Sequence, residues 1–175
     1  TVSIVGSYWI SGADAGPVHP LPLGMPQGVT VLPGRAMCRA FLLGGHYQFG
    51  TPTSLLYRAD IVRSRAEFFE EAFDSADVEG CLSFWNGWDF GFVPQILTFN
   101  RIRAGSAYDA AKRRGEEFQR DLVLLKRFGD QYLAPDELRS RARQVLKSYY
   151  QYLGSRVYDR AGREFWDFHD KNLRA

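Results

Sequence analysis

Residues 50–101 constrain the fold more than any other part of the chain, because strand and helix patterns alternate along them. A serine and two leucines run into Tyr57 and Arg58 after a Gly-Thr-Pro turn, which predicts a buried strand. Residues 59–69 then predict a short helix. An acidic turn opens a second helix, and an aromatic-rich strand is expected over residues 89–101. This order of elements indicates an α/β unit.

Asp77 stands where the second helix is expected to begin, in the sequence Asp77-Val78-Glu79. A carboxylate at a helix N-terminus lies close to exposed backbone N–H groups and stabilises the helix. A catalytic carboxylate would also suit this position. The residues alone leave both interpretations open.

Taken together, the pieces of this segment resemble the second half of the catalytic domain of family 2 glycosyltransferases. These enzymes use nucleotide sugars and have the GT-A fold. The matching pieces are, in order, Gly50, residues 52–58 (PTSLLYR), residues 69–71 (FEE), Asp77 with Glu79, and residues 89–101 (DFGFVPQILTFNR). Their order and spacing carry the resemblance, which extends back to about Val2 and does not cover the tail after about Gly105.

The resemblance implies inverting transfer of a sugar from a nucleotide-sugar donor to an acceptor hydroxyl, with Asp77 as the general base. Glu79 would orient the acceptor or a neighbouring group, although a solvated acid of the first helical turn explains it as well. Further acceptor-binding positions are Pro52, Thr53, Ser54 and Trp85, with Gly50 and Thr51 beside them. Gln95 and Arg101 would bind the diphosphate, since a guanidinium suits phosphate oxygens.

Each of these positions also has a structural explanation. Residues 50–54 can be a turn that leads into a strand, and Arg101 can be an arginine at a surface strand end. The aromatic residues Trp85, Trp88 and Phe90 can stack on a sugar ring, but clustered aromatic residues more often form core.

The chain departs from the family pattern in two places. Pro94 precedes Gln95 where many relatives have a histidine, so any role of that histidine is absent here. The Asp-x-Asp metal motif expected ahead of Val2 is also missing, and Asp14 has no acidic partner. The expectation is therefore an acceptor-side fragment of a longer enzyme. The missing half would bind a Mg²⁺ or Mn²⁺ ion. This chain by itself is expected to bind no metal, to bind a nucleotide sugar only weakly and to be inactive in transfer.

The front of the chain predicts a strand at residues 2–8, a long surface excursion over residues 11–33 and a helix at residues 35–43 that Gly44 and Gly45 stop. Cys38 and Cys81 lack metal-ligand spacing and are expected to be reduced in a cytosolic interior. The three histidines, at positions 19, 46 and 169, show no ligand spacing and are expected to be ordinary surface or core residues. No apolar run reaches the roughly 18 residues that a membrane span needs.

The tail predicts three helices. The first runs from a cap at Ser106 to Gly129, the second from Pro135 to Gly154, and the third over residues 159–173. Residues 101–175 carry a net charge of +6, against −4 for residues 1–100. A basic tail suits an anionic membrane surface, a nucleic acid or solvated helix faces. Its apolar stripes look inward-facing, and it lacks the patterns of a nucleic-acid binder.

The predicted architecture is thus a partial GT-A sheet at residues 1–104 followed by a helical extension at residues 105–175. The predicted function is glycosyl transfer, of the kind used in polysaccharide biosynthesis, with a saccharide or lipid-linked acceptor. No nucleic-acid partner is expected. The protein is expected in the cytoplasm, either free or peripherally associated with the inner face of the membrane. The alternative is a non-catalytic remnant that binds carbohydrate or a protein partner.

Overall fold

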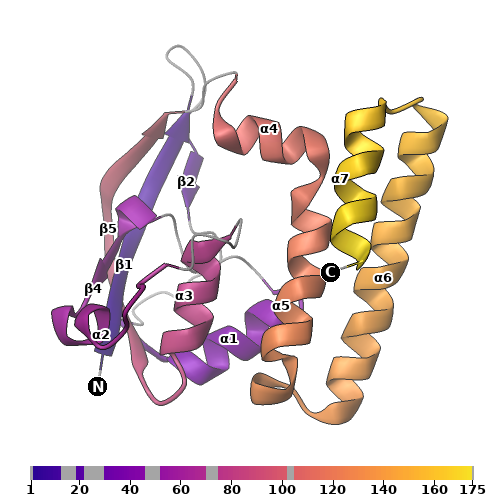
Figure 1. The fold of residues 1–175 in the computed structure, drawn as a ribbon. Helices are drawn as coiled ribbons and strands as arrows, with labels where there is room; N and C mark the ends of the chain where they lie inside the picture. Colours follow the sequence, from indigo (N-terminus) through magenta and orange to yellow (C-terminus); the bar gives the residue numbers. More distant parts are fainter. Residues whose placement is uncertain are drawn as a thin grey trace. The chain divides into compact units, whose positions relative to one another are not determined.

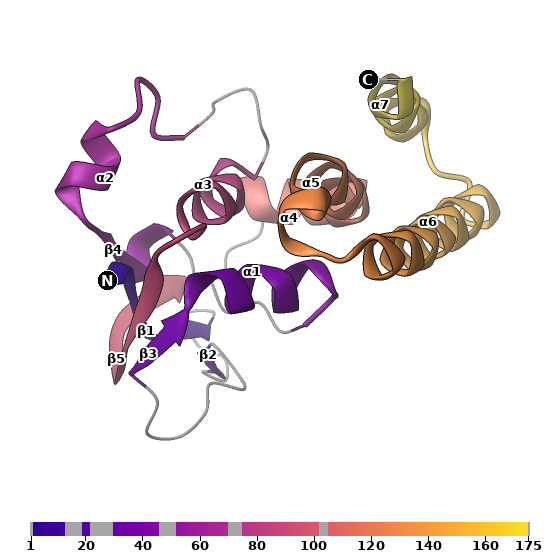
Figure 2. The ribbon, with the colours of Figure 1, turned by 90° about the horizontal axis from the view of Figure 1, so that it is seen from below.

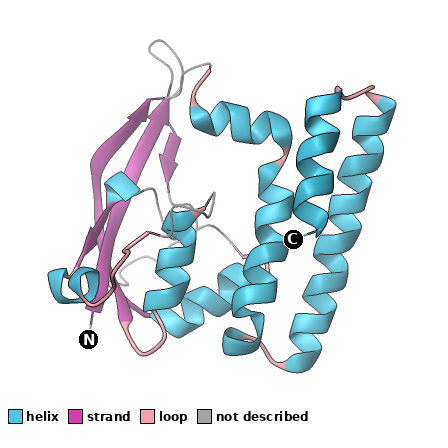
Figure 3. Cartoon of the chain, viewed as in Figure 1, coloured by secondary structure: helices cyan, strands magenta, loops and turns pink. Residues whose placement is uncertain are grey.

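The computed structural model describes residues 2–12, 19–21, 30–45, 52–69, 75–101 and 105–174. The chain divides into two compact units, Thr1–Arg103 and Ala104–Ala175. The first unit is an α/β structure, and the described part of the second consists of helices joined by turns (Figure 3). The division falls one residue before the predicted position.

The first unit is built on a mixed sheet whose long central strands run parallel. Strand β1 (Val2–Gly12) pairs with β5 (Asp89–Arg101) along most of its length. The shorter strands β2 (His19–Leu21) and β4 (Leu55–Tyr57) pair antiparallel with the other edge of β1, and β3 (Val31–Pro33) pairs antiparallel with β5. Parallel neighbours need a long crossover, which here includes every residue between β1 and β5.

Two helices cover one face of this sheet, as Figures 1 and 2 show: α1 (Gly34–Leu42) and α3 (Ala76–Phe84). Paired residues of neighbouring strands share a face, so Ile4, Phe90 and Tyr57 all point to the same side. The buried apolar side chains of this unit are Ile4, Met37, Cys38, Leu42, Ile61, Val78, Cys81, Leu82, Phe84, Trp85, Phe90 and Phe92.

Two glycines allow close packing within this unit. A Cβ on Gly6 would lie 2.6 Å from the Phe90 ring of the neighbouring strand, and one on Gly34 would lie 2.7 Å from the Trp85 Cβ. The Gly34 N–H also donates to the Trp88 carbonyl at 3.0 Å, which ties the start of α1 to the turn after α3. A larger residue at position 6 would therefore displace the Phe90 ring, and one at position 34 would push α1 away from the end of α3.

Several predicted elements of this unit are confirmed in position but not in detail. The helix predicted at 35–43 is α1, and Gly44 ends it with a φ of 87°. The first strand extends to Gly12 rather than residue 8, and the predicted excursion contains β2 and β3. The strand predicted as buried is β4, but Leu56 is exposed because it pairs with Val5 and so points to the face opposite the one that α1 and α3 cover. The next helix, α2 (Ala59–Arg63), stops well before residue 69.

The described part of the second unit, residues 105–174, contains four helices where three were predicted. They are α4 (Ala107–Arg114), α5 (Glu116–Tyr132), α6 (Pro135–Tyr158) and α7 (Arg163–Arg174). Gly115 separates α4 from α5 because its φ of 68° is left-handed. The Tyr152 side chain also occupies the space that a Cβ on Gly115 would need.

The two glycines that were predicted to end helices instead lie inside them. Gly129 belongs to α5, and a Cβ there would lie 2.5 Å from a Leu138 methyl carbon, so the glycine allows α5 and α6 to pack closely. Gly154 lies within α6 with open space around it. A single glycine costs a helix only about 1 kcal/mol, which tertiary packing readily outweighs. The predicted start of α6 at Pro135 is confirmed, and a Glu137 carboxylate oxygen accepts the Ala134 N–H at 3.0 Å.

His169 is a core residue that links three helices of this unit. Its Nε2 lies 2.8 Å from the Arg114 carbonyl, which can only accept, so Nε2 carries the proton. The Tyr149 hydroxyl, 2.6 Å from Nδ1, must therefore be the donor. Burial lowers the pKa of His169 and raises the pKa of Tyr149 to about 12. The pair thus holds α6 and α7 to the end of α4 while both groups are neutral.

Because the pKa values of His169 and Tyr149 are shifted in the folded chain, we predict that the protein loses stability at both ends of the pH range. Below about pH 6.5 the unfolded chain binds more protons than the folded one, because the folded-state pKa of His169 is lowered. The free energy of unfolding should therefore fall as the pH drops below that value. Above pH 10 the unfolded tyrosine loses its proton first, and stability should fall again up to about pH 12. Urea titrations across pH, followed by circular dichroism, measure both effects.

The variant Tyr149→Phe removes one of the two groups while keeping the ring. We expect a loss of about 1 kcal/mol of unfolding free energy at neutral pH and a smaller further loss between pH 10 and 12. The matched control is Tyr150→Phe, at the exposed neighbouring position. Equal behaviour of the two variants would show that the Tyr149–His169 bond contributes nothing.

Candidate functional site

Asp77 lies in the first turn of α3, as predicted, and its side chain is partly exposed. One of its carboxylate oxygens accepts the backbone N–H of Val78 at 2.9 Å. The bond fixes one oxygen at the positive end of the helix. Among the described residues, Asp77 forms no ion pair. Asp77 is therefore a carboxylate whose position is fixed by a hydrogen bond and which solvent can still reach.

Glu79 has the opposite environment, because its side chain is 0% exposed. The Ser83 hydroxyl donates to Oε1 at 2.6 Å, and Nη2 of Arg65 lies 3.8 Å from the same oxygen. The interpretation of Glu79 as a solvated first-turn acid is therefore wrong. A sealed side chain cannot touch an acceptor, so of the two predicted functional roles only the positioning of a neighbouring group fits the structure.

An aromatic cluster holds α3 against β4 and the residues after α2. The Phe68 ring lies 4.9 Å from Tyr57, 4.6 Å from Phe69 and 5.2 Å from Phe84. Gly80 sits directly under Phe69, whose ring carbons would be 3.4 Å from an added Cβ. Sequence reasoning placed Phe68 and Phe69 in a helix. The structure places them after α2, where they pack on the helix that carries Asp77.

Arg65 joins this cluster to Glu79. Its guanidinium carbon lies 5.1 Å from the centre of the Phe84 ring, while Nη2 faces the Glu79 carboxylate. Nothing in the sequence distinguished this arginine from its neighbours, because its partner lies 14 residues further along the chain. Arg65 is the residue of this region that the sequence analysis missed.

The three aromatic residues proposed to stack on a sugar have different environments. Trp85 is 0% exposed, and its ring lies 5.4 Å from Phe90, which is also buried. Sugar stacking by Trp85 or Phe90 is therefore wrong, since both fill the space between the sheet and the helices. Trp88 is partly exposed and stacks under the guanidinium of Arg58 at 5.0 Å. Of these three residues, Trp88 alone could offer a ring to a ligand.

The predicted acceptor-binding turn is a 3₁₀ turn, η1 (Pro52–Ser54), which leads into β4. Pro52 and Thr53 are exposed, whereas Ser54 is buried. The Thr53 hydroxyl donates to the Asn100 side-chain carbonyl at 3.4 Å, so η1 meets the C-terminal end of β5. Gly50 and Thr51 lie outside the described residues, as do Glu70 and Glu71 of the acidic turn.

The two residues proposed for the diphosphate lie on β5, and both are exposed. Val93 pairs with Ser7, but Tyr8 pairs with Ile96, so Pro94 and Gln95 form a bulge in β5. A bulge suits proline, which has no N–H for the ladder. Arg101 follows at the end of the strand, next to Asn100. The structure thus brings Thr53 close to the end of β5, but no hydrogen bond or ion pair links Asp77 to Gln95 or Arg101 among the described residues.

Cys38 and Cys81 are buried, as predicted, and form no disulfide. Burial raises the pKa of the Cys81 thiol, which keeps it protonated and unreactive. The described residues contain no group of three or more His, Cys, Asp or Glu side chains that could hold a metal. Asp14 and His46 lie outside them, and the His19 side chain is not described. No described helix is long and apolar enough to cross a membrane.

Comparison of the chain with family models, with curated proteins and with solved structures finds no match.

The sealed Glu79 generates a prediction about the framework under Asp77. Replacement by alanine removes the acceptor of the Ser83 hydroxyl and the partner of Arg65, so Glu79→Ala should lower the free energy of unfolding by about 1–3 kcal/mol. The matched control is Glu67→Ala, at an exposed position outside any described helix. Urea denaturation of both variants checks the difference. An effect of Glu79→Ala no larger than that of the control would contradict the described burial.

Proposed function

We propose that this chain takes part in glycosyl transfer from a nucleotide sugar, with Asp77 as the general base. The supporting observation is the contrast between two acids of one helical turn. Asp77 is partly exposed and held by a backbone N–H, while Glu79 is sealed and bonded to Ser83 and Arg65. A base needs both access to its substrate and a fixed position.

In the proposed reaction, Asp77 removes the proton of an acceptor hydroxyl as that oxygen attacks the anomeric carbon. The bond to the nucleoside diphosphate breaks on the opposite side, so the configuration inverts. The departing diphosphate carries negative charge, and the exposed guanidinium of Arg101 could compensate part of it, with Gln95 as a hydrogen-bond donor. No described residue group fits a Mg²⁺ or Mn²⁺ ion, so no step is assigned to a metal here.

The fold supports the same proposal at a coarse level. Under it, the sheet with parallel β1 and β5 and the covering helices α1 and α3 are the acceptor-side half of a GT-A domain. Asp77 stands at the start of the helix that immediately precedes β5, the strand with the proposed diphosphate residues. The acceptor is proposed to meet η1 and Trp88, the exposed candidates that remain after Ser54 and Trp85 are assigned to the core.

The variant Asp77→Asn keeps the size of the side chain and one carbonyl oxygen to accept the Val78 N–H, but cannot take a proton. We expect turnover to fall by about 10²–10⁴-fold while binding of the nucleotide sugar stays unchanged. Release of nucleoside diphosphate, measured with a panel of nucleotide sugars and saccharide acceptors in the longest natural protein that contains this chain, gives turnover. Calorimetry gives donor binding.

The matched control is Asp60→Asn, because Asp60 is also an acid in the first turn of a helix but is paired with Arg58. This variant should keep normal turnover. If Asp77→Asn kept more than a tenth of wild-type turnover, Asp77 would not be the base. Carbohydrate binding by the wild type without transfer to any acceptor would instead favour the alternative of a non-catalytic binding remnant.

A further inference from the structure

Helix α6 has two apolar stripes, and only one of them is used inside the unit. The inner stripe was expected from the sequence and consists of Leu138, Ala142, Val145, Tyr149 and Tyr152, of which Val145 and Tyr149 are buried. Residues one position further along the helix are rotated by about 100°. That rotation brings Leu146, Tyr150, Leu153 and Val157 together on an outer stripe.

The outer stripe is open to solvent. Leu146 is 38% exposed, Tyr150 60% and Val157 64%, and Tyr158 at the end of the helix is 89% exposed. The four stripe residues follow one another at steps of three and four, so they form a continuous strip along the second half of α6. Large apolar side chains gathered in this way on one exposed face indicate an interaction surface.

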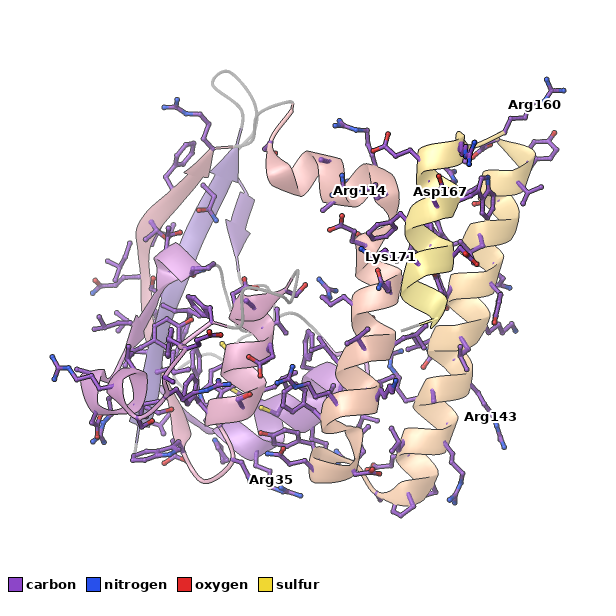
Figure 4. The ribbon with its side chains drawn as sticks, in the orientation of Figure 1. Arg35, Arg114, Arg143, Arg160, Asp167 and Lys171 are labelled. Atoms are coloured by element: carbon purple, nitrogen blue, oxygen red, sulfur yellow. The ribbon has the colours of Figure 1, made fainter. Side chains whose placement is uncertain are left out.

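Basic side chains lie in the same sector of the helix. Arg139, Arg143 and Lys147 are exposed, and Arg160 follows in the turn after α6. Figure 4 shows Arg143 and Arg160 projecting away from the helices. No acid among the described residues forms an ion pair with any of these four cations. The acids nearby are Asp136 at the start of the helix and Asp159, which is paired with Arg156.

We propose that the outer face of α6, defined by Leu146, Tyr150, Leu153 and Val157 with Arg139, Arg143, Lys147 and Arg160, docks on an anionic membrane surface. The helix would lie along the surface without crossing it. Tyrosine suits the boundary between headgroups and acyl chains, and long basic side chains reach from an apolar strip to phosphate groups. This inference is independent of glycosyl transfer.

Charge favours a lipid surface over a second copy of the chain. Two copies meeting through this face would each bring the same four unpaired cations to one interface, with Asp136 as the acid in that sector. Anionic headgroups instead neutralise all four. The net charge of +6 over residues 101–175 adds a longer-range attraction in the same direction.

The test is flotation of the full chain with vesicles of phosphatidylglycerol and phosphatidylcholine, compared with vesicles of phosphatidylcholine alone. We expect binding to the anionic vesicles that weakens as salt is raised, and little binding to the neutral ones. The double variant Arg139→Gln, Arg143→Gln should bind roughly 30-fold more weakly. The double variant Tyr150→Ser, Val157→Ser should also bind more weakly. Because it removes apolar contacts, which salt does not screen, it should lose the binding that the wild type retains at high salt.

A control variant removes two charges elsewhere in the unit: Lys112→Gln on α4 and Lys171→Gln on α7, both exposed. It should bind within a few-fold of the wild type. Circular dichroism confirms that each variant folds. The proposal is overturned if the wild type does not bind anionic vesicles, or if the control loses as much affinity as the α6 variants. Sedimentation velocity showing a dimer that Tyr150→Ser with Val157→Ser dissociates would overturn it as well, in favour of an interface between copies.

Discussion

The parallel pairing of β1 with β5 is the constraint on which the first unit depends. Parallel neighbours cannot be joined by a tight turn, so the chain must pass from the C-terminal end of β1 back to the end of the sheet where β1 began before it enters β5. Helices α1 and α3 are placed by that crossover, and both pack on the face that Ile4 and Phe90 present. Asp77 owes its position to the last helix of this path, directly before β5 begins.

Local patterns predicted the elements along this path well. The start of α3, the extent of α1 and the strand β5 follow from capping residues, helical spacing and β-branched or aromatic runs. Burial could not be predicted in the same way. Leu56 looks like a core residue, but its register with Val5 turns it to the face of the sheet opposite α1 and α3, which leaves this side chain exposed. Glycines were ambiguous too: Gly115 interrupts a helix through its left-handed φ of 68°, whereas Gly129 and Gly154 lie inside helices.

The candidate site was predictable only in part, for the same reason. The position of Asp77 in the first turn of α3 follows from sequence. The sealing of Glu79 does not, because Arg65 reaches it, and Phe68 and Phe69 pack on α3, through tertiary contacts. Trp85 was assigned to a ligand and belongs to the core, since the ring packs against Phe90 and its Cβ lies against Gly34. In the second unit the inner stripe of α6 was evident, whereas the outer one emerges only from exposure.

The central claim is that two acids two residues apart differ in solvent access: the Asp77 side chain is partly exposed, whereas the Glu79 side chain is buried. Carbodiimide-directed amine labelling of the native chain, mapped by mass spectrometry, measures this directly. The account predicts that Asp77 is labelled in the folded protein, while Glu79 is modified only after unfolding. Protection of Asp77 to the same degree as Glu79 would contradict it, because a carboxylate that a small amine cannot reach cannot take a proton from an acceptor sugar.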